Sequence, residues 1–388
     1  MRARINLAFV CAFAVVLLAP VVQMTTHIAH EPAVEEMRKP KPISRLIPRL
    51  AAMDPTLADD INGWFNDRYG FRGLLIRINN EIEYDAFRMS DRVVIGQDGW
   101  LFTKDWLALI AQNSRDAAME DASIAAVRHL RDCLAARGVR LVVVLNTWKS
   151  SLYPQYLPAP LPVDPPARLL ERLSRTLATE PDILFVDGEK ILFAHRDDLL
   201  FHKTDVHMDL KGASYVYRAL IEDIARDLHQ QSPRLPVEKW SLVTSPDGSE
   251  ARFLAKLIPP TEVVYITPTT DDALKSDRFD TFDFNVGSAE LPQYPDLPLW
   301  DWIYRNKRAA GGLLPPTMVF GTSFIDAFFG LRYNEAFETV YRTRNNVAER
   351  IGPLMRHLPS DVKVFVLEVP EPLLYLLPQM KLPAACMS

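Results

Sequence analysis

The sequence predicts an α/β fold: a three-layer sandwich in which helices cover both faces of a mostly parallel β-sheet, preceded by an N-terminal membrane helix. Two patterns carry this prediction. Short apolar runs typical of buried strands alternate along the chain with amphipathic helical segments, as in folds built from crossover connections. A long apolar stretch also follows directly on a basic leader. At 388 residues, 48% of them hydrophobic, the chain is long enough to bury a large core.

The N-terminal segment indicates export. Arg2 and Arg4 precede the apolar residues 5–22, which are interrupted only by Asn6 and Pro20. A run of about 18 residues is short for a membrane span but longer than the roughly 7 to 15 residues of a signal-peptide core. Residues 23–30 contain no clean A-x-A cleavage site, which favours an uncleaved signal-anchor over a cleaved signal peptide for residues 1–24. We expect the rest of the chain in the periplasm, anchored to the inner membrane.

The remaining elements follow in order. Residues 25–60, with alternating Lys and Pro near residue 40, are expected to form an extended spacer, and residues 61–388 one large domain. An irregular stretch at about 231–315, rich in Pro, Asp and Thr, reads as an insertion with an antiparallel strand at 262–267. We predict a helix-rich region at 62–87, helices at 122–138, 166–180 and 212–230, and buried strands at 139–146, 183–187, 317–320 and 362–369.

Charge and cysteine content exclude some classes of function. The formal net charge is −5 and the basic clusters lie only near the N-terminus, so nucleic acid is not an expected partner. The three cysteines, Cys11, Cys133 and Cys386, are scattered and predict no disulfide framework. After export only Cys133 and Cys386 could pair, and the sequence leaves that open.

A serine at a strand-to-loop corner is the first candidate for catalysis. The apolar strand at 317–320 ends at Gly321, which is expected to permit a conformation that a residue with a Cβ resists. Ser323 then stands near a helix N-terminus, where free backbone N–H groups can stabilise an oxyanion. The competing interpretation is that Ser323 is an ordinary N-cap.

A second segment supplies an acid and a base two positions apart. Asp205 and His207 precede a helix that begins near Asp209, and in extended chain two such residues share a side. A carboxylate beside an imidazole fixes the tautomer that a serine nucleophile needs from its base. In the competing, non-catalytic interpretation, Asp205 caps the helix and His207 is an ordinary, partly exposed histidine. A third interpretation takes His202, Asp205, His207 and Asp209 as metal ligands, but their spacing fits no common zinc pattern. We expect no metal and no cofactor.

The sequence resembles the alginate O-acetyltransferase family of the AlgX and AlgJ type, whose periplasmic domain is similar to SGNH hydrolases. Five segments in the expected order carry the resemblance: residues 66–72, residues 94–102, Lys149 with residues 152–158, the D-x-H segment 203–207, and the Gly-Thr-Ser-Phe segment 321–324. The resemblance implies an SGNH hydrolase-like sandwich and a triad of Asp205, His207 and Ser323. It also implies a polysaccharide acceptor and a membrane-embedded acyltransferase that supplies acetyl groups.

The predicted function is therefore O-acetyl transfer to an alginate-like exopolysaccharide through an acetyl-serine. A deacetylating esterase with the same triad and a non-catalytic polysaccharide-binding scaffold are the alternatives. The family tryptophan after the histidine is Met208 here, and Thr322 replaces the commoner aspartate of the serine motif.

Further residues are assigned supporting roles around the triad. The expected oxyanion donors are Gly321, Thr322 and Asn146, and the expected contacts to an anionic polysaccharide are Lys149, Arg68 and Arg72. Five tryptophans could stack on sugar rings but are expected mainly in or near the core: Trp100, Trp106, Trp148, Trp300 and Trp302. Glu368 on the last strand is expected to be a structural ion-pair partner.

Overall fold

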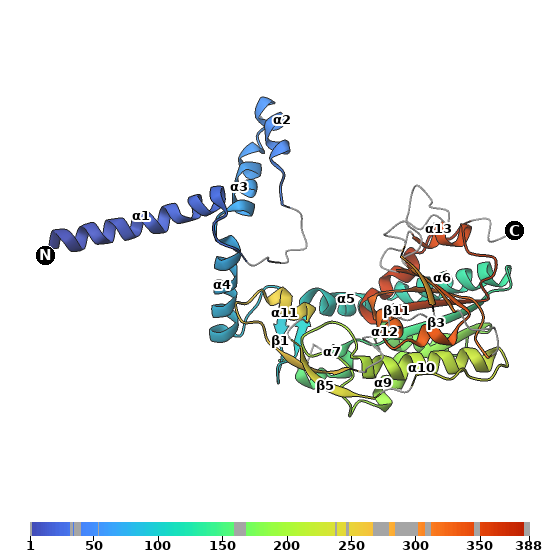
Figure 1. The fold of residues 1–388 in the computed structure, drawn as a ribbon. Helices are drawn as coiled ribbons and strands as arrows, with labels where there is room; N and C mark the ends of the chain where they lie inside the picture. Colours follow the sequence, from blue (N-terminus) through green and yellow to red (C-terminus); the bar gives the residue numbers. More distant parts are fainter. Residues whose placement is uncertain are drawn as a thin grey trace.

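A seven-stranded sheet forms the centre of the molecule. The computed structural model describes residues 2–31, 34, 40–52, 54–158, 168–236, 239–245, 248–266, 279–283, 302–306, 312–344 and 350–383. Within these ranges the strand order is β4-β3-β11-β9-β10-β8-β7 (Figure 1). In this order the neighbouring strands from β4 to β10 are parallel to one another. Strand β8 pairs antiparallel with β10, and β7 pairs antiparallel with β8. The strands are β3 (Arg140–Asn146), β4 (Ile183–Asp187), β7 (Phe279–Asp283), β8 (Trp302–Asn306), β9 (Thr317–Gly321), β10 (Thr339–Arg344) and β11 (Val364–Pro370).

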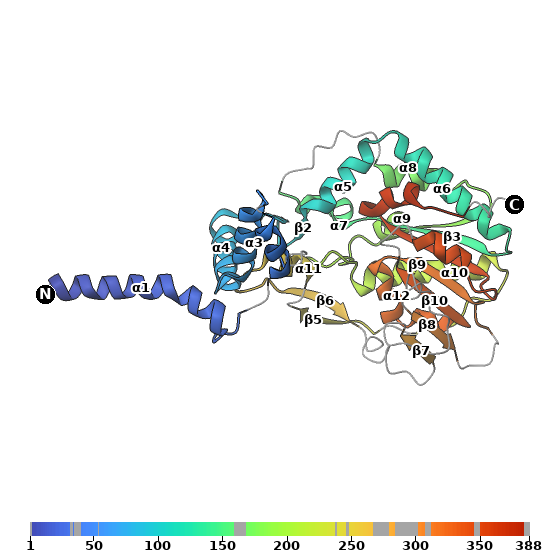
Figure 2. The same ribbon diagram turned by 90° about the horizontal axis from the view of Figure 1, so that it is seen from above.

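Helices cover both faces of this sheet (Figure 2). Alternate residues of β3 show the division, because Val142 and Val144 pack in one hydrophobic cluster while Leu141 and Val143 pack in the other. The first cluster contains α10 (Leu210–Asp227) and α12 (Asp326–Gly330), and the second contains α6 (Ala118–Ala135), α8 (Leu169–Leu177) and α13 (Ile351–Arg356). The predicted α/β class with a mostly parallel sheet is confirmed.

Further short elements complete this part of the chain. Two hairpin-like pairs lie outside the main sheet: β1 (Val93–Ile95) with β2 (Leu101–Thr103), and β5 (Ser241–Ser245) with β6 (Glu262–Ile266). The other elements are α5 (Lys104–Arg115), α7 (Lys149–Leu152), η2 (Pro154–Tyr156), α9 (Gly188–Ala194), α11 (Ser249–Leu254), η4 (Ser323–Ile325), η5 (Tyr333–Ala336) and η7 (Glu371–Gln379).

The stretch predicted as an insertion therefore contributes to the fold itself. Its strands β7 and β8 extend the main sheet, and its antiparallel strand β6 lies where the sequence placed one. The last residue of that predicted strand, Thr267, and the tail residue Cys386 lie outside the described residues.

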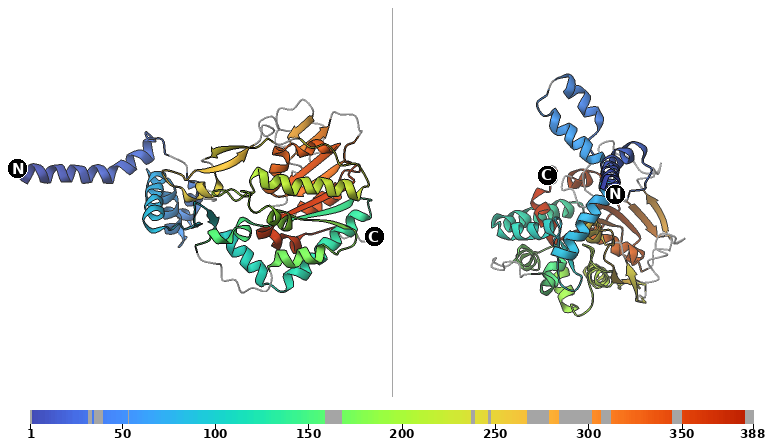
Figure 3. Two further views of the ribbon diagram at one scale, coloured as in Figure 1. Left: turned by 90° about the horizontal axis from the view of Figure 1, so that it is seen from below. Right: turned by 90° about the vertical axis from the view of Figure 1, so that its left-hand side faces the viewer.

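The N-terminal region extends away from the sheet (Figures 1 and 3). Helix α1 (Arg2–Thr26) is followed by η1 (Ile43–Arg45), α2 (Leu46–Ala51), α3 (Leu57–Arg68) and α4 (Arg72–Phe87). By length and composition α1 is able to cross a membrane from Asn6 to Thr26, although a signal sequence passes the same test. Because η1, α2 and the start of α3 lie within residues 25–60, the expectation of an extended spacer there is wrong in part. The buried apolar core begins at Val93.

Candidate active site

Ser323 lies at the carboxyl end of β9, as expected, but it is not the helix cap. The side chain of Thr322 accepts a hydrogen bond from the Phe324 N–H at 3.2 Å and so caps η4. The hydroxyl of Ser323 is thereby left for another partner. Its Oγ lies 2.7 Å from Nε2 of His207.

His207 connects this serine to Asp205. Its Nδ1 is 2.5 Å from Oδ1 of Asp205, and the same carboxylate oxygen accepts the His207 backbone N–H at 2.9 Å. The His207 side chain is 34% exposed and that of Asp205 16% exposed, so the imidazole is open to solvent while the carboxylate is shielded. The three side chains thus form a continuous Ser-His-Asp array.

The surroundings of Asp205 keep its carboxylate ionised. Burial alone would raise its pKa, but hydrogen bonds from His207 and from the Ser249 N–H outweigh burial, and the pKa lies well below its usual value. The Ser249 bond to Oδ2 is 2.6 Å long. Asp205 does not cap the following helix, since that role belongs to Asp209, whose side chain accepts from the Lys211 N–H. An ionised carboxylate is what the imidazole needs as an orienting partner.

Gly321 packs closely against its neighbours but does not adopt the special backbone conformation that was predicted for it. It is not among the glycines with positive φ in the described part of the chain, which are Gly99, Gly138 and Gly312. A Cβ at position 321 would instead lie 3.2 Å from both Cβ and Oε2 of Glu368 on the neighbouring strand β11. The expectation of a special backbone conformation is therefore wrong, and close packing against Glu368 takes its place.

Two of the groups predicted as oxyanion donors instead donate hydrogen bonds to the carboxylate of Glu368. Its Oε2 accepts the Thr322 N–H at 2.7 Å, and its Oε1 accepts the Asn146 side-chain amide at 2.8 Å. Burial raises the Glu368 pKa, while these hydrogen bonds oppose the rise. Thr322 and Asn146 therefore do not offer these N–H groups to a substrate, and Gly321 is the last residue of β9, paired in register with Arg344. The Ser323 N–H, by contrast, has no hydrogen-bond partner in the described part of the chain.

Lys149 is buried, which contradicts its predicted role at the polysaccharide. Its side chain is 0% exposed and forms an ion pair with Glu250, which is also 0% exposed. The ammonium group donates to the carbonyl of Asp205 at 2.9 Å and to those of His202 and Lys203 at 3.4 Å. Lys149 therefore holds the loop that carries the acid and the base, and it is not available to a large substrate.

Several residues that fix this loop were missed from the sequence. The N–H groups of Glu250 and Ala251, at the start of α11, donate to the Thr204 carbonyl at 3.0 and 3.1 Å. A Cβ on Gly248 would lie 2.1 Å from that carbonyl oxygen, so only glycine allows the approach. Glu262 of β6 accepts from the Thr204 hydroxyl at 2.7 Å. These residues lie in the stretch interpreted as an insertion, and nothing else in the sequence indicated that they contact the Asp205 loop.

A small pocket of about 170 Å³ opens beside Ser323. Trp106, Trp148 and Phe324 line it, together with Val206, Thr322, Pro370 and Leu373. The rings of Trp148 and Phe324 stack with centroids 5.3 Å apart, and Trp148 is 2% exposed. Two of the five tryptophans considered above therefore reach the site. Trp100 is buried elsewhere, and Trp300 and the side chain of Trp302 lie outside the described residues.

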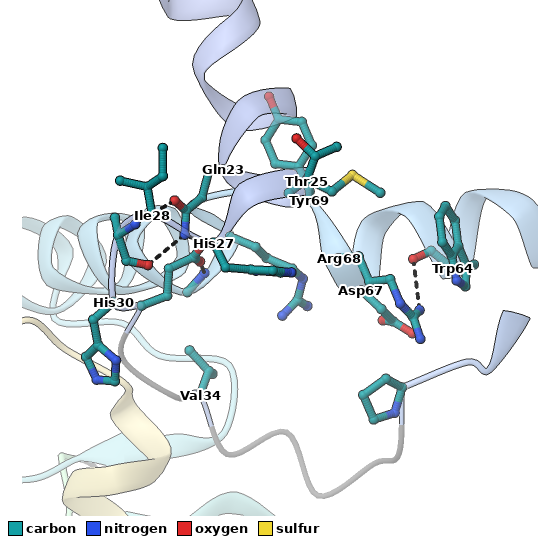
Figure 4. Close-up of a pocket in the computed structure, with 16 residues that line it drawn as sticks. Gln23, Thr25, His27, Ile28, His30, Val34, Trp64, Asp67, Arg68 and Tyr69 are labelled. Atoms are coloured by element: carbon teal, nitrogen blue, oxygen red, sulfur yellow. Dashed lines mark hydrogen bonds between the residues drawn. The ribbon is translucent and has the colours of Figure 1, made fainter.

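Arg68 and Arg72 do not reach this pocket. They line a separate pocket of about 1070 Å³ between the end of α1 and the corner that joins α3 to α4 (Figure 4). Arg68 donates to the carbonyls of Lys41 and Trp64 at 2.9 and 3.4 Å. The predicted contact of these arginines with a substrate held at Ser323 is not supported by their position.

A metal site is not formed by the candidate residues. Among the residues that the structure describes, no group of three or more His, Cys, Asp and Glu side chains is arranged to hold a metal ion. His202 pairs instead with Glu262, with Nδ1 and Oε1 3.5 Å apart. Met208, at the position where the family has tryptophan, is buried in the core.

The fold is an α/β domain with a mostly parallel sheet, and Ser323 at the carboxyl end of β9 belongs to a Ser-His-Asp array. Residues 93–283 match the family described as "SGNH hydrolase-like domain, acetyltransferase AlgX". The protein "Probable alginate O-acetylase AlgJ" of Pseudomonas syringae pv. tomato is 27% identical over 261 residues, which are 63% of this chain and 65% of that protein. The AlgJ of Pseudomonas aeruginosa is 30% identical over 178 residues, 45% of this chain and 43% of that protein. The chain thus spans just under two thirds of the length of the first of these relatives.

Solved structures resemble the chain more distantly. The O-acetyltransferase domain of Pseudomonas putida AlgJ has 19% identity and a TM-score of 0.45, covering 76% of this chain and 94% of that one. Bacillus cereus PatB1 has 14% identity and a TM-score of 0.47, covering 71% and 95%. Residues 93–283 are therefore similar to an SGNH hydrolase-like domain of the AlgX type, and the chain shows distant sequence similarity to the probable alginate O-acetylase AlgJ.

Proposed function

We propose that this protein is a periplasmic O-acetyltransferase that transfers acetyl groups to hydroxyls of an alginate-like exopolysaccharide through an acetyl-Ser323 intermediate. The observation that carries the proposal is the position of His207, with Nε2 2.7 Å from Ser323 Oγ and Nδ1 2.5 Å from Asp205 Oδ1. These distances are within reach for proton transfer and for orientation of the imidazole.

In the first half-reaction, Ser323 Oγ attacks the acetyl carbonyl while its proton passes to His207 Nε2. Asp205 holds the other ring nitrogen and stabilises the imidazolium that forms. The Ser323 N–H is the donor we assign to the oxyanion, because it lacks another partner among the described residues. The tetrahedral species then collapses, the leaving group takes the proton from His207, and acetyl-Ser323 remains.

In the second half-reaction, a sugar hydroxyl gives its proton to His207 and attacks the acetyl-serine, which releases the acetylated sugar and restores Ser323. The small apolar pocket lined by Trp106 and Trp148 suits an acetyl group better than a sugar ring. The polymer would then lie along the open side of the site, where His207 is exposed. The resemblance to AlgJ and AlgX supports a membrane-embedded acyltransferase as acetyl donor and the inner membrane as the site of anchoring through α1.

An esterase is the second candidate. The 34% exposure of the His207 side chain favours it, because water can reach the base as readily as a sugar hydroxyl can. The two candidates differ only in the molecule that takes the acetyl group from Ser323.

The test uses the purified full-length chain, a chromogenic acetyl ester as donor and acetyl-free alginate oligosaccharides as acceptor. A transferase produces acetylated oligosaccharide and turns over faster when oligosaccharide is added. An esterase produces only acetate at a rate indifferent to oligosaccharide. Ser323→Ala should abolish both products, while Ser232→Ala, at an exposed serine, should behave like the unmodified protein. A Ser323→Ala variant with full activity would remove the enzyme assignment.

A further inference from the structure

The corner between α3 and α4 is fixed to the end of the apolar helix α1. Gly70 packs so closely there that a Cβ would lie 2.1 Å from the carbonyl oxygen of Pro20 and 2.8 Å from Cβ of Gln23. Glu31 adds a second connection, because Oε1 accepts both the Phe71 N–H at 2.8 Å and the Gln23 side-chain amide at 3.0 Å. The position of α1 in a membrane therefore sets the position of α3 and α4.

If α1 spans a bilayer from Asn6 to Thr26, this contact places the corner beside the last turns of the span, close to the membrane surface. Pro20 lies six residues before the end of α1 at Thr26, a distance of about 9 Å along the helix. Helices α3 and α4 run across the axis of α1 (Figures 1 and 3), so that the right-hand view of Figure 3 shows α1 end-on and the other two lengthwise. If α1 spans a bilayer, these two helices lie along its surface.

The polarity of α4 is the reverse of that of an ordinary surface helix. Its polar side faces the rest of the protein, where Arg77 donates to the Lys256 carbonyl at 2.6 Å and Asn80 to the Leu254 carbonyl at 2.8 Å. A different side, with the i, i+3, i+7 spacing of one helix face, carries large apolar residues that are 38 to 55% exposed. These exposed residues are Leu75, Ile78 and Ile82.

Helix α3 shows the same property. Neither α3 nor α4 contains a buried residue, and α3 exposes Ile61 and Phe65 one turn apart. Short helices in water usually depend on a packed apolar face for their stability. The two helices therefore present an apolar surface that the described part of the chain leaves uncovered, which we call the α3–α4 surface: Ile61, Phe65, Leu75, Ile78 and Ile82.

We propose that the α3–α4 surface lies in the lipid headgroup region, with its apolar side chains directed into the boundary of the hydrocarbon. Helices that lie in the membrane plane with an apolar side some 5 to 10 Å deep are a known mode of membrane binding. Trp64 and Tyr69 line the pocket at the same end of α1, and such aromatic residues are typical of both membrane interfaces (Figure 4). These residues favour lipid over the apolar flank of another protein as the occupant.

A second contact with the membrane has a consequence for the catalytic domain. A single spanning helix lets the attached domain tilt freely, whereas two additional helices that lie in the surface plane restrict that tilt. Helix α4 passes this restriction on through its bonds to Lys256 and Leu254 at the end of α11, the helix that also holds the Asp205 loop. The inference rests on α1 crossing a membrane, and it does not depend on acetyl transfer.

Quenching by labelled lipids tests the proposal on the full-length chain in phosphatidylcholine–phosphatidylglycerol vesicles. Cys11 and Cys386 are replaced by serine, and Cys133 is kept because it is buried. A fluorophore is then attached at Ile78→Cys or Ile82→Cys, and lipids that carry a nitroxide on the acyl chain serve as quencher. The matched control is Ala125→Cys on α6, an exposed helical position in the catalytic domain.

The proposal predicts that the labels at 78 and 82 lose most of their fluorescence and that the label at 125 keeps it. Labels at 78 and 82 that are as bright as the control would overturn it. If those positions are unquenched in vesicles but shielded from a water-soluble thiol reagent in native membranes, a protein covers the surface and the lipid proposal is wrong. None of these readings requires enzymatic activity.

Discussion

Removing Lys149 should destabilise the catalytic domain strongly, because its partner Glu250 would remain as an unpaired buried carboxyl. Both side chains are 0% exposed. Deleting one member of such a pair usually lowers the free energy of unfolding by about 3 to 5 kcal/mol. We predict a loss of this size for Lys149→Met. The control Lys190→Met, at an exposed lysine of α9, should change stability by less than about 0.5 kcal/mol.

The same pair predicts a dependence of stability on pH. Burial raises the pKa of Glu250 from 4.5 to about 7, although Lys149 and Thr103 oppose the rise. The folded protein thus holds this proton more tightly than the unfolded chain does. The resulting stabilisation is fully present below about pH 4.5 and is lost as the pH rises through the raised pKa. Glu250→Gln should remove this part of the pH dependence.

Urea denaturation of the full-length protein and each variant in detergent, at several pH values between 4.5 and 8, measures both effects. The double variant Lys149→Met with Glu250→Gln should recover part of the stability lost in Lys149→Met, because neither buried charge remains. Activity with an acetyl ester should fall in Lys149→Met, since its ammonium group holds the Asp205 carbonyl. Lys149→Met as stable and active as Lys190→Met, or Glu250→Gln with an unchanged pH dependence, would refute the reasoning.

Two further substitutions test the supports of the site. Gly321→Ala places a Cβ 3.2 Å from Glu368, so we expect a loss of about 1 to 3 kcal/mol by denaturation and a lower kcat/KM as Ser323 shifts; unchanged values would mean that this contact is loose. Asp205→Asn should lower kcat on the order of 10³ to 10⁴-fold. Because the pKa of Asp205 lies below its usual 3.8, its carboxylate stabilises the fold above that pH and less as the pH falls below it. The variant should lose that pH dependence in acid denaturation, and a variant with ordinary kcat would exclude Asp205 as the orienting group.

The main-sheet strands predicted from the sequence are four consecutive parallel strands that begin at the β4 edge of the sheet. Strands β3, β4, β9 and β11 are apolar runs, and each was placed within two residues at both ends. Strand β10 was missed because Arg342 and Thr343 break its apolar pattern, yet both are buried between neighbouring elements. Local pattern is informative where a strand is covered on both faces by apolar groups, and it fails where buried polar groups find distant partners.

The same distinction applies to the site. Asp205, His207 and Ser323 were singled out because each lies in a short motif, and the fold brings His207 within hydrogen-bond distance of the other two. Lys149 was placed at the surface because nothing near it in the sequence indicates that Glu250, about a hundred residues away, neutralises it in the core. Thr322 and Asn146 were taken as free donors because the acceptor that engages them, Glu368, lies on another strand. Partners distant in the chain decide which polar groups are available, and one sequence does not reveal them.

The central claim, that Ser323 carries the acetyl group, is tested most directly by mass spectrometry of the intact protein after brief exposure to an acetyl ester. The account predicts a gain of one acetyl group that peptide mapping places on Ser323, that is absent in Ser323→Ala, and that oligosaccharide discharges faster than water does. Since Thr322 and not Ser323 caps η4, the variant should remain folded. A protein that turns over the ester without acetylating Ser323, or acetylates Ser323→Ala equally, would contradict the account.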